Sequence, residues 1–253
     1  MEYFVSKESI VRTIWGKGDT ILFIFAGSAA EFALNKAVDW LYFTGKLPAD
    51  PLGRLFETVS YAREIVFSEK QKALVAIDRI RNIHTAVENA RGSTIPDWAY
   101  RDVLYMLVHY SIAAYELLER KLTDDEKEEV FRVFRRLGER MELKELPTNF
   151  HDWLKSRHEH LQQDLAHSDY TADLFQQYKK HLGAVRYQLL KEGQVLVVPD
   201  SVRRMLGFRK LSLLAPVVPV YKLSRRVHAD TLIKALILPP DYKQQIKDLD
   251  VAP

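Results

Sequence analysis

A histidine lies on the apolar face of a helix predicted over residues 69–90. The residues of this face follow one another at spacings of four, three, four and three positions, the repeat of one side of an α-helix. They are Ala73, Ile77, Ile80, His84 and Val87. A histidine on such a face is either a neutral core residue with both ring nitrogens satisfied or a ligand to a metal or haem iron. The pattern by itself favours the core histidine and leaves the ligand open.

A second histidine, His109, lies inside a segment that is apolar on nearly every side. Residues 99–118 are rich in Val, Leu, Ile, Met and Ala. A helix with apolar side chains all round is typical of the centre of a bundle. We therefore expect a central helix over residues 97–121, with His109 as a further candidate for binding a cofactor.

An arginine and a threonine form another candidate pair. Arg54 and Thr58 are four residues apart, so they share one face of the helix predicted over residues 51–67. Arg54 is either an exposed residue near the first turn or an arginine that reaches haem propionates or polarises dioxygen, with Thr58 as a hydrogen-bond donor. Spacing alone favours the exposed arginine.

Four histidines crowd a short segment, but their spacing argues against a metal site. His158 and His160 are two residues apart, which points them to nearly opposite faces of a helix. His151 and His158 are seven residues apart, and so are His160 and His167. Neither interval is the i, i+4 spacing of a helical zinc site. We interpret the cluster as a solvated helix face.

Composition excludes several classes of protein. The 253 residues include no cysteine, which excludes disulfides, iron–sulfur clusters, a cysteine nucleophile and covalent haem attachment through Cys-x-x-Cys-His. Lys and Arg number 37 against 34 Asp and Glu, and no dense basic stripe follows the chain, so we expect no nucleic-acid partner.

Helical patterns dominate the chain and predict an all-α, single-domain multi-helix bundle over residues 1–253. Strand-type alternation is nearly absent, apart from an extended piece expected at 195–198. Gly183 and Gly207 are predicted breaks or ends. The predicted helices are 6–15, 20–43, 51–67, 69–90, 97–121, 124–140, 149–166, 171–190, 200–206 and 222–236.

No segment has the character of a signal peptide or of a membrane span. The most apolar early stretch, residues 21–34, is short and is interrupted by Glu31. Residues 211–221 are apolar but contain Pro216 and Pro219. We expect a cytoplasmic protein in which this segment is buried, with peripheral docking on a membrane as the alternative.

An ordered set of short motifs resembles one family. The set is Gly27-Ser-Ala-Ala-Glu-Phe-Ala-Leu, Asp50-Pro-Leu-Gly-Arg54-Leu-Phe-Glu-Thr58, Ile83-His84-Thr-Ala-Val87, Arg91-Gly92, Val103-Leu-Tyr-Met-Leu-Val-His109, Leu122-Thr-Asp-Asp-Glu126, Glu145-Leu-Pro147, Val198-Pro199 and Leu238-Pro-Pro240. Over roughly residues 20–240 the chain is similar to the catalytic domain of bacterial rubber oxygenases (latex clearing proteins) and fungal MpaB-type oxygenases. The Arg-x-x-x-Thr and His-x-x-Val motifs are the strongest evidence for this resemblance.

The resemblance implies an all-α fold around a pocket for a non-covalent haem b. Characterised members cleave carbon–carbon double bonds of polyisoprene or isoprenoid chains with dioxygen. The family's proximal histidine falls on His84, and its haem-pocket arginine and threonine fall on Arg54 and Thr58. The implied partners are dioxygen and a hydrophobic small-molecule substrate.

The chain departs from the rubber enzymes at the residue before the threonine. They carry a lysine there, where it can cap the distal iron position, and this chain carries Glu57. Their catalytic glutamate lies upstream of the arginine, a region that contains Glu31 and Asp39. We therefore expect a smaller lipid or isoprenoid substrate. The alternatives are a non-catalytic haem- or lipid-binding protein of the same fold and a helical interaction module with a structural His84.

Overall fold

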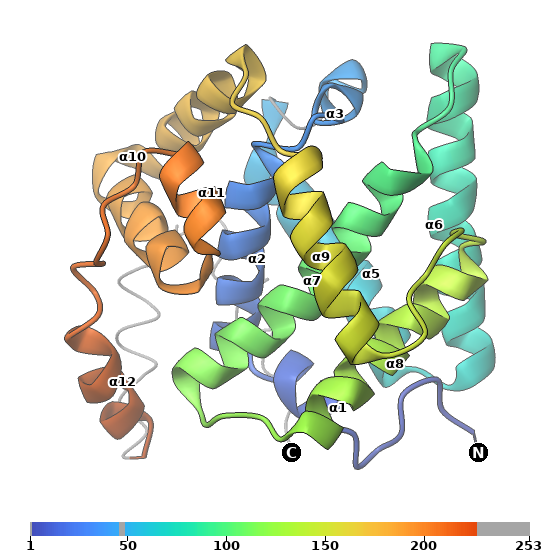
Figure 1. Ribbon diagram of the computed structural model, residues 1–253, viewed down its shortest axis with the longest axis horizontal. Coiled ribbons are helices and arrows are strands. Elements are labelled where there is room, and N and C mark those ends of the chain that lie inside the picture. The colour runs from blue at the N-terminus through green and yellow to red at the C-terminus, as the bar shows by residue number, and fades with distance from the viewer. Residues whose placement is uncertain (1, 46–48, 227–253) are drawn as a thin grey trace.

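The computed structural model describes residues 2–45 and 49–226, and within these ranges it is almost entirely α-helical (Figure 1). The described part contains no β-strand. It has two isolated antiparallel bridges, Tyr3 with Glu69 and Asn35 with Leu165. The predicted all-α fold class is therefore confirmed.

The helices of the described ranges are labelled in Figure 1. In chain order they are α1 (Ile10–Trp15), α2 (Gly18–Phe32), α3 (Asp39–Phe43), α5 (Pro51–Phe67), α6 (Lys70–Arg91), α7 (Asp97–Leu118), α8 (Asp124–Arg140), α9 (Phe150–Gln163), α10 (Asp169–Val197), α11 (Asp200–Met205) and α12 (Val217–Arg226).

Helix α7 is the centre of the bundle, as its all-round apolar pattern predicts. It packs along much of α2 and also contacts α1, α8, α9, α10 and α12. In Figure 1 it crosses the middle of the molecule, with α9 on the near side. A residue on α7 can therefore meet side chains from several helices that are distant in the sequence.

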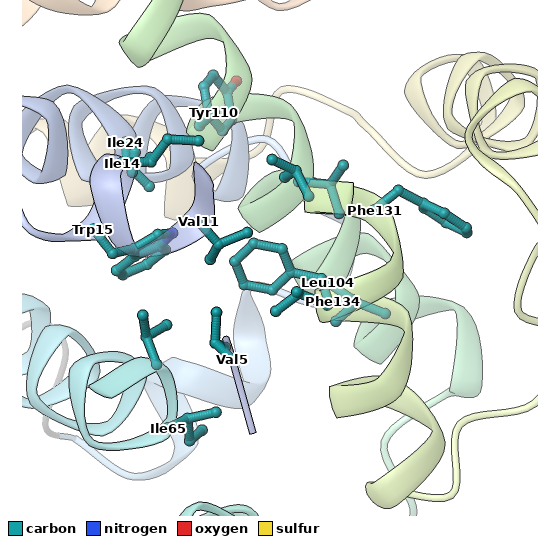
Figure 2. Packing of buried hydrophobic residues seen from close by; sticks show 14 of the residues in the cluster. Val5, Val11, Ile14, Trp15, Ile24, Ile65, Leu104, Tyr110, Phe131 and Phe134 are labelled. Carbon is teal, nitrogen blue, oxygen red and sulfur yellow. The ribbon is translucent and has the colours of Figure 1, made fainter. Parts of the chain in front are cut away.

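The main hydrophobic core lies where α1, α2, α5, α7 and α8 meet (Figure 2). Trp15 is fully buried at its centre. Its ring meets Phe25 edge-on at 6.1 Å, and its indole Nε1 donates to Ser111 Oγ at 3.1 Å. The indole thus supplies apolar area while its one polar atom is satisfied by α7.

Several helix ends follow the predicted local chemistry. Thr123 and Glu126 form a capping box at the start of α8, so two terminal amides are satisfied by side chains. Gly183 interrupts α10 with a φ of 72°, and Gly207 follows α11 with a φ of 63°. Both glycines were expected as breaks or ends, and both adopt left-handed conformations that other residues disfavour.

One predicted helix, 20–43, is wrong because tertiary contacts interrupt it. The chain leaves α2 after Phe32 and forms no α-helix again until α3. Between them, the backbone pairs with the segment that follows α9: Lys36 N donates to Asp164 O at 2.9 Å, and Ala166 N donates to Leu34 O at 2.7 Å. These bonds replace the helical ones, and they join residues about 130 positions apart.

The C-terminal predictions need two corrections. The extended piece expected at 195–198 is wrong, because α10 continues to Val197 and only Val198 is extended. The helix expected over 222–236 starts earlier, at Val217. Its remainder lies outside the described residues, as does the Leu238-Pro-Pro240 motif.

Residues 211–221 are largely exposed, so the expected burial of this segment is wrong. Leu211, Leu213 and Val220 expose 74%, 61% and 64% of their surface. Only Ser212 is buried, where its hydroxyl donates to the Glu192 carbonyl at 2.9 Å. Among the helices that the structure describes, none combines the length and apolar character needed to cross a bilayer.

A substitution at Gly27 tests the close packing of α2 on α7. A Cβ atom at this position would lie 2.3 Å from two ring carbons of Tyr110. Gly27→Ala must displace this buried ring, so we expect a loss of about 1–3 kcal/mol in the free energy of unfolding. Chemical denaturation followed by circular dichroism measures it.

Gly193→Ala is the matched control, because a Cβ there meets only Phe23, at 3.5 Å. In a helix with room for the methyl group, this change is expected to raise stability by about 0.5–1 kcal/mol. A Gly27→Ala protein as stable as the Gly193→Ala protein would contradict the packing described here.

Candidate functional site

The stripe that carries His84 is buried at one end of α6 and half-buried at the other. Ala73 and Ile77 are fully buried, whereas Ile80, His84 and Val87 keep part of their surface accessible. The predicted core-facing stripe is therefore confirmed for the first half of the helix. His84 lies where that face emerges from the core.

The His84 imidazole has an unsatisfied nitrogen. Its Nδ1 is buried and makes no hydrogen bond within the described part of the chain. The ring packs against Tyr100 of α7, with centroids 5.2 Å apart. Burial lowers the pKa of His84, the Arg54 guanidinium lowers it further, and Glu88 opposes both. The neutral imidazole, the form that binds metals, is therefore favoured.

The structure brings Arg54 near His84. Arg54 is half-buried on α5, and its charge acts on the imidazole. Its Nη1 lies 2.5 Å from Glu57 Oε2, so the two side chains form an ion pair along one helix face. Thr58 is exposed, and its hydroxyl donates to the Arg54 carbonyl at 3.0 Å. In this conformation the Thr58 hydroxyl therefore donates its hydrogen to the helix backbone.

Asp39 lies beside the C-terminal end of the same helix as His84. Its Oδ2 is 2.6 Å from Arg91 Nη2, and the Arg91 guanidinium also stacks over the Trp40 ring at 4.0 Å from its centroid. These contacts join α3 to α6. Of the two acids upstream of Arg54, Asp39 is thus the one in contact with the helix that carries His84.

Glu31 is fully buried in a different place, between α2, α7 and α9. Arg157 binds both of its oxygens, at 2.6 and 2.5 Å, and the Tyr110 hydroxyl donates to it at 2.7 Å. Burial raises the pKa of Glu31, but the facing Arg157 outweighs it and holds the pKa below its ordinary value. An ionised carboxylate with three short contacts is a structural anchor and a poor proton acceptor.

His109 adjoins this buried ion pair. Its ring meets Tyr110 edge-on at 4.9 Å, and its Nε2 is buried without a hydrogen-bond partner among the described residues. Burial lowers the pKa of His109 to about 4, with a further contribution from Arg157 and opposition from Glu31 and from a hydrogen bond to the Val197 backbone. His109 is therefore neutral near pH 7, and it lies beside the buried Glu31–Arg157 ion pair.

The prediction that the histidine cluster is a solvated face is wrong for one member. His151, His158 and His167 are exposed, as expected. His160 is only 9% exposed. Its Nδ1 lies 2.9 Å from Asp102 Oδ1 on α7 and 2.5 Å from Asp164 Oδ2 at the end of α9.

One sequence signal could have indicated the contact between His160 and Asp164. His160 and Asp164 have the i, i+4 spacing that the four histidines lack among themselves. The third member, Asp102, comes from a helix 58 residues earlier, so no local pattern reveals it.

A pH series tests the buried, neutral state of His109. The unfolded chain takes up a proton here near pH 6.5 and the folded chain only near pH 4. This residue therefore removes stability as the pH falls between those values, on the order of 3 kcal/mol. The wild type should therefore lose more unfolding free energy between pH 7 and pH 4 than His109→Gln does, by about 3 kcal/mol.

The exposed histidine variant His151→Gln is the control and should follow the wild-type profile. Equal pH profiles for His109→Gln and the wild type would show that His109 titrates normally in the folded state, contrary to this account.

Comparison with known proteins confirms the resemblance found in the motifs. The family model described as ER-bound oxygenase mpaB/B'/Rubber oxygenase, catalytic domain, matches residues 15–229. No curated protein and no solved structure matches the chain. The matched range covers most of the 253 residues and includes the α5, α6 and α7 residues described above. The chain therefore belongs to the mpaB/rubber oxygenase catalytic-domain family.

Proposed function

We propose that this protein is a haem b-dependent oxygenase that uses dioxygen to cleave a carbon–carbon double bond in a hydrophobic isoprenoid or lipid-like substrate. The observation that carries the proposal is the His84 imidazole, which is neutral, holds a buried nitrogen without a partner and faces Arg54. Membership of an oxygenase family makes iron the favoured partner of that imidazole.

The residues around His84 fit a haem in two respects. A buried ring nitrogen without a hydrogen bond is costly, on the order of 1–3 kcal/mol, and coordination of that nitrogen to iron would offset this cost. Arg54 supplies a positive charge beside the ligand, and a guanidinium pairs well with propionate carboxylates. His84 would hold the iron and Arg54 a propionate.

The haem, when bound, would supply the redox chemistry with dioxygen. The chain would supply position and environment. Tyr100 packs on His84 and restricts the rotation of its ring, while the Tyr100 hydroxyl is held by Glu88 at 3.2 Å. Glu57 neutralises Arg54 where the rubber enzymes place a cation.

A second candidate is a haem- or lipid-binding protein without turnover. The Arg54–Glu57 ion pair favours it, because the guanidinium that would act on dioxygen or a propionate already has an anionic partner on its own helix. The Thr58 hydroxyl likewise already donates a hydrogen bond, to the Arg54 carbonyl.

We also propose that the protein contacts a membrane peripherally, as suits an apolar substrate. The exposed apolar side chains near the end of the described chain lie beside basic ones such as Arg209 and Lys210. An apolar surface with flanking cations suits an anionic lipid interface. The apolar side chains are Leu211, Leu213, Val217, Val220 and Leu223.

Vesicle sedimentation tests this contact. The wild type should bind phosphatidylserine-containing vesicles, and the double variant Leu211→Asp, Leu213→Asp should bind at least about tenfold more weakly, since burying each charge is costly. Val185→Asp is the control, because Val185 is 76% exposed on α10 and is not one of the apolar side chains of this segment. Equal binding by both variants and the wild type would refute the contact.

The role of His84 is tested by replacing it with alanine. His84→Ala should lose stoichiometric haem and the Soret band of the wild type, because the iron loses its ligand. His151→Ala, an exposed histidine variant, should keep both. A His84→Ala protein with full haem content and an unchanged Soret band would overturn the assignment.

Turnover separates the two candidate functions. Reduced wild-type protein incubated with squalene and dioxygen should form carbonyl products that mass spectrometry detects, and His84→Ala should form none. A haem-bound wild type that yields no carbonyl product with squalene or an unsaturated fatty acid would favour the binding protein.

A further inference from the structure

Asp102, His160 and Asp164 present three ligand atoms to one point. One atom from each residue lies within 4.8 Å of the other two. The His160 Nδ1 is the shared neighbour, at 2.9 Å from Asp102 Oδ1 and 2.5 Å from Asp164 Oδ2. Two helices, α7 and α9, fix this arrangement, because Asp102 belongs to the first and the other two residues to the second and its cap.

Burial lowers the pKa of His160, but Asp102 and Asp164, which lie at ion-pair distances from its Nδ1, outweigh burial and raise the pKa. Asp102 Oδ1 and His160 Nδ1 are both buried, and neither makes a well-directed hydrogen bond within the described structure. Asp102 is 1% exposed and His160 9%, so water does not readily replace the missing bonds. One ring N–H also cannot serve two carboxylates at once. The geometry is that of atoms converging on a common partner.

The spacing is somewhat tighter than that around a bound metal ion. Ligands bound at about 2.1 Å to one tetrahedral Zn²⁺ lie about 3.4 Å apart. The two distances from His160 Nδ1, 2.9 and 2.5 Å, are shorter than this value. The side chains would therefore move apart by roughly 0.5–1 Å to admit a cation between the three atoms.

A neighbouring amide orients the Asp102 carboxylate. Asn35 Nδ2 donates to Asp102 Oδ2 at 2.6 Å, which leaves Oδ1 directed at His160. Asn35 is itself fixed, because its Oδ1 accepts from Ala37 N at 2.8 Å. Support of this kind, from a side chain that binds the outer oxygen of a ligand, is common around protein metal sites.

The carboxylates of the buried region outnumber its cations. Asp102 and Asp164 are two acids beside a single imidazole, and Glu31 adds a third carboxylate that acts on Asp102. The nearby Arg157 is already bound to both oxygens of Glu31. A protonated His160 would balance one carboxylate only, whereas a divalent ion balances two.

We propose that Asp102, His160 and Asp164 bind one divalent transition-metal cation, Zn²⁺ in the first place. One imidazole nitrogen with two carboxylate oxygens is a donor set suited to Zn²⁺ and less suited to Ca²⁺ or Mg²⁺, which take oxygen ligands. The ion joins α7 to α9 and, through Asn35, to the segment that follows α2. It is independent of the proposed haem at His84 on α6.

Zinc content and affinity test the proposal. The protein, purified without a metal-affinity tag and without chelator, should contain one zinc per chain by inductively coupled plasma mass spectrometry. After removal of metal, competition with a chromophoric chelator gives the Zn²⁺ affinity. His160→Gln and Asp164→Asn should each lower this affinity at least about 10- to 100-fold.

His158→Gln is the matched control, because His158 lies on the same helix and is exposed; its affinity should equal that of the wild type. Circular dichroism verifies folding, and Asp164→Asn, at the end of α9 with a side chain 16% exposed, is the variant expected to fold if His160→Gln does not. X-ray absorption at the zinc edge should show a nitrogen and oxygen shell with one imidazole.

Two results would overturn the proposal. One is a wild type that binds Zn²⁺ no more tightly than Asp164→Asn, which would leave the three residues as a plain ion-pair cluster. The other is an equal loss of affinity in His158→Gln, which would place the ion on the exposed face of α9.

Discussion

The arrangement of the helices depends on one buried ion pair, between Glu31 of α2 and Arg157 of α9. The carboxylate is fully buried and the guanidinium nearly so. Removing two charges from water is costly, and the cost is offset only when the geometry is close and the remaining polar atoms find partners. Here the guanidinium binds both oxygens and Tyr110 of α7 adds a hydroxyl. Three helices are therefore held in one relative position, because any shift would leave a buried charge without its partner.

The protein thus has two polar regions of different character. The first is the rigid centre between α2, α7 and α9, where Glu31, Arg157 and the neutral His109 adjoin the Asp102–His160–Asp164 cluster. The second is the half-buried surface of α5 and α6, where His84 has an unsatisfied nitrogen and Arg54 supplies a charge. The first region explains why the bundle has a unique packing. The second is partly exposed, and it is the region where we propose that the cofactor binds.

Local patterns in the sequence predicted what depends on neighbouring residues. The capping box at Thr123, the stop at Gly207 and the central position of α7 are of this kind, as is the face of α6 that carries His84. Features that depend on distant residues were missed. The break after Phe32 arises from backbone bonds to Asp164 and Ala166. Trp153, Arg157 and His160 follow one another at spacings of four and three positions on the buried face of α9, but the charged Arg157 in that face conceals the pattern. The contact of His160 with Asp102 joins it to a distant helix.

We propose that this fold holds haem b in non-covalent form, and the absorption spectrum of the wild-type protein decides whether it does. The protein would be purified from cells supplied with a haem precursor, and a pyridine haemochrome assay would follow. We expect a Soret band, one haem b per chain and complete extraction of the haem into acidified organic solvent, because the chain has no cysteine to attach it. A protein that stays colourless after reconstitution with haemin would show that the fold holds no haem and that His84 is a structural residue.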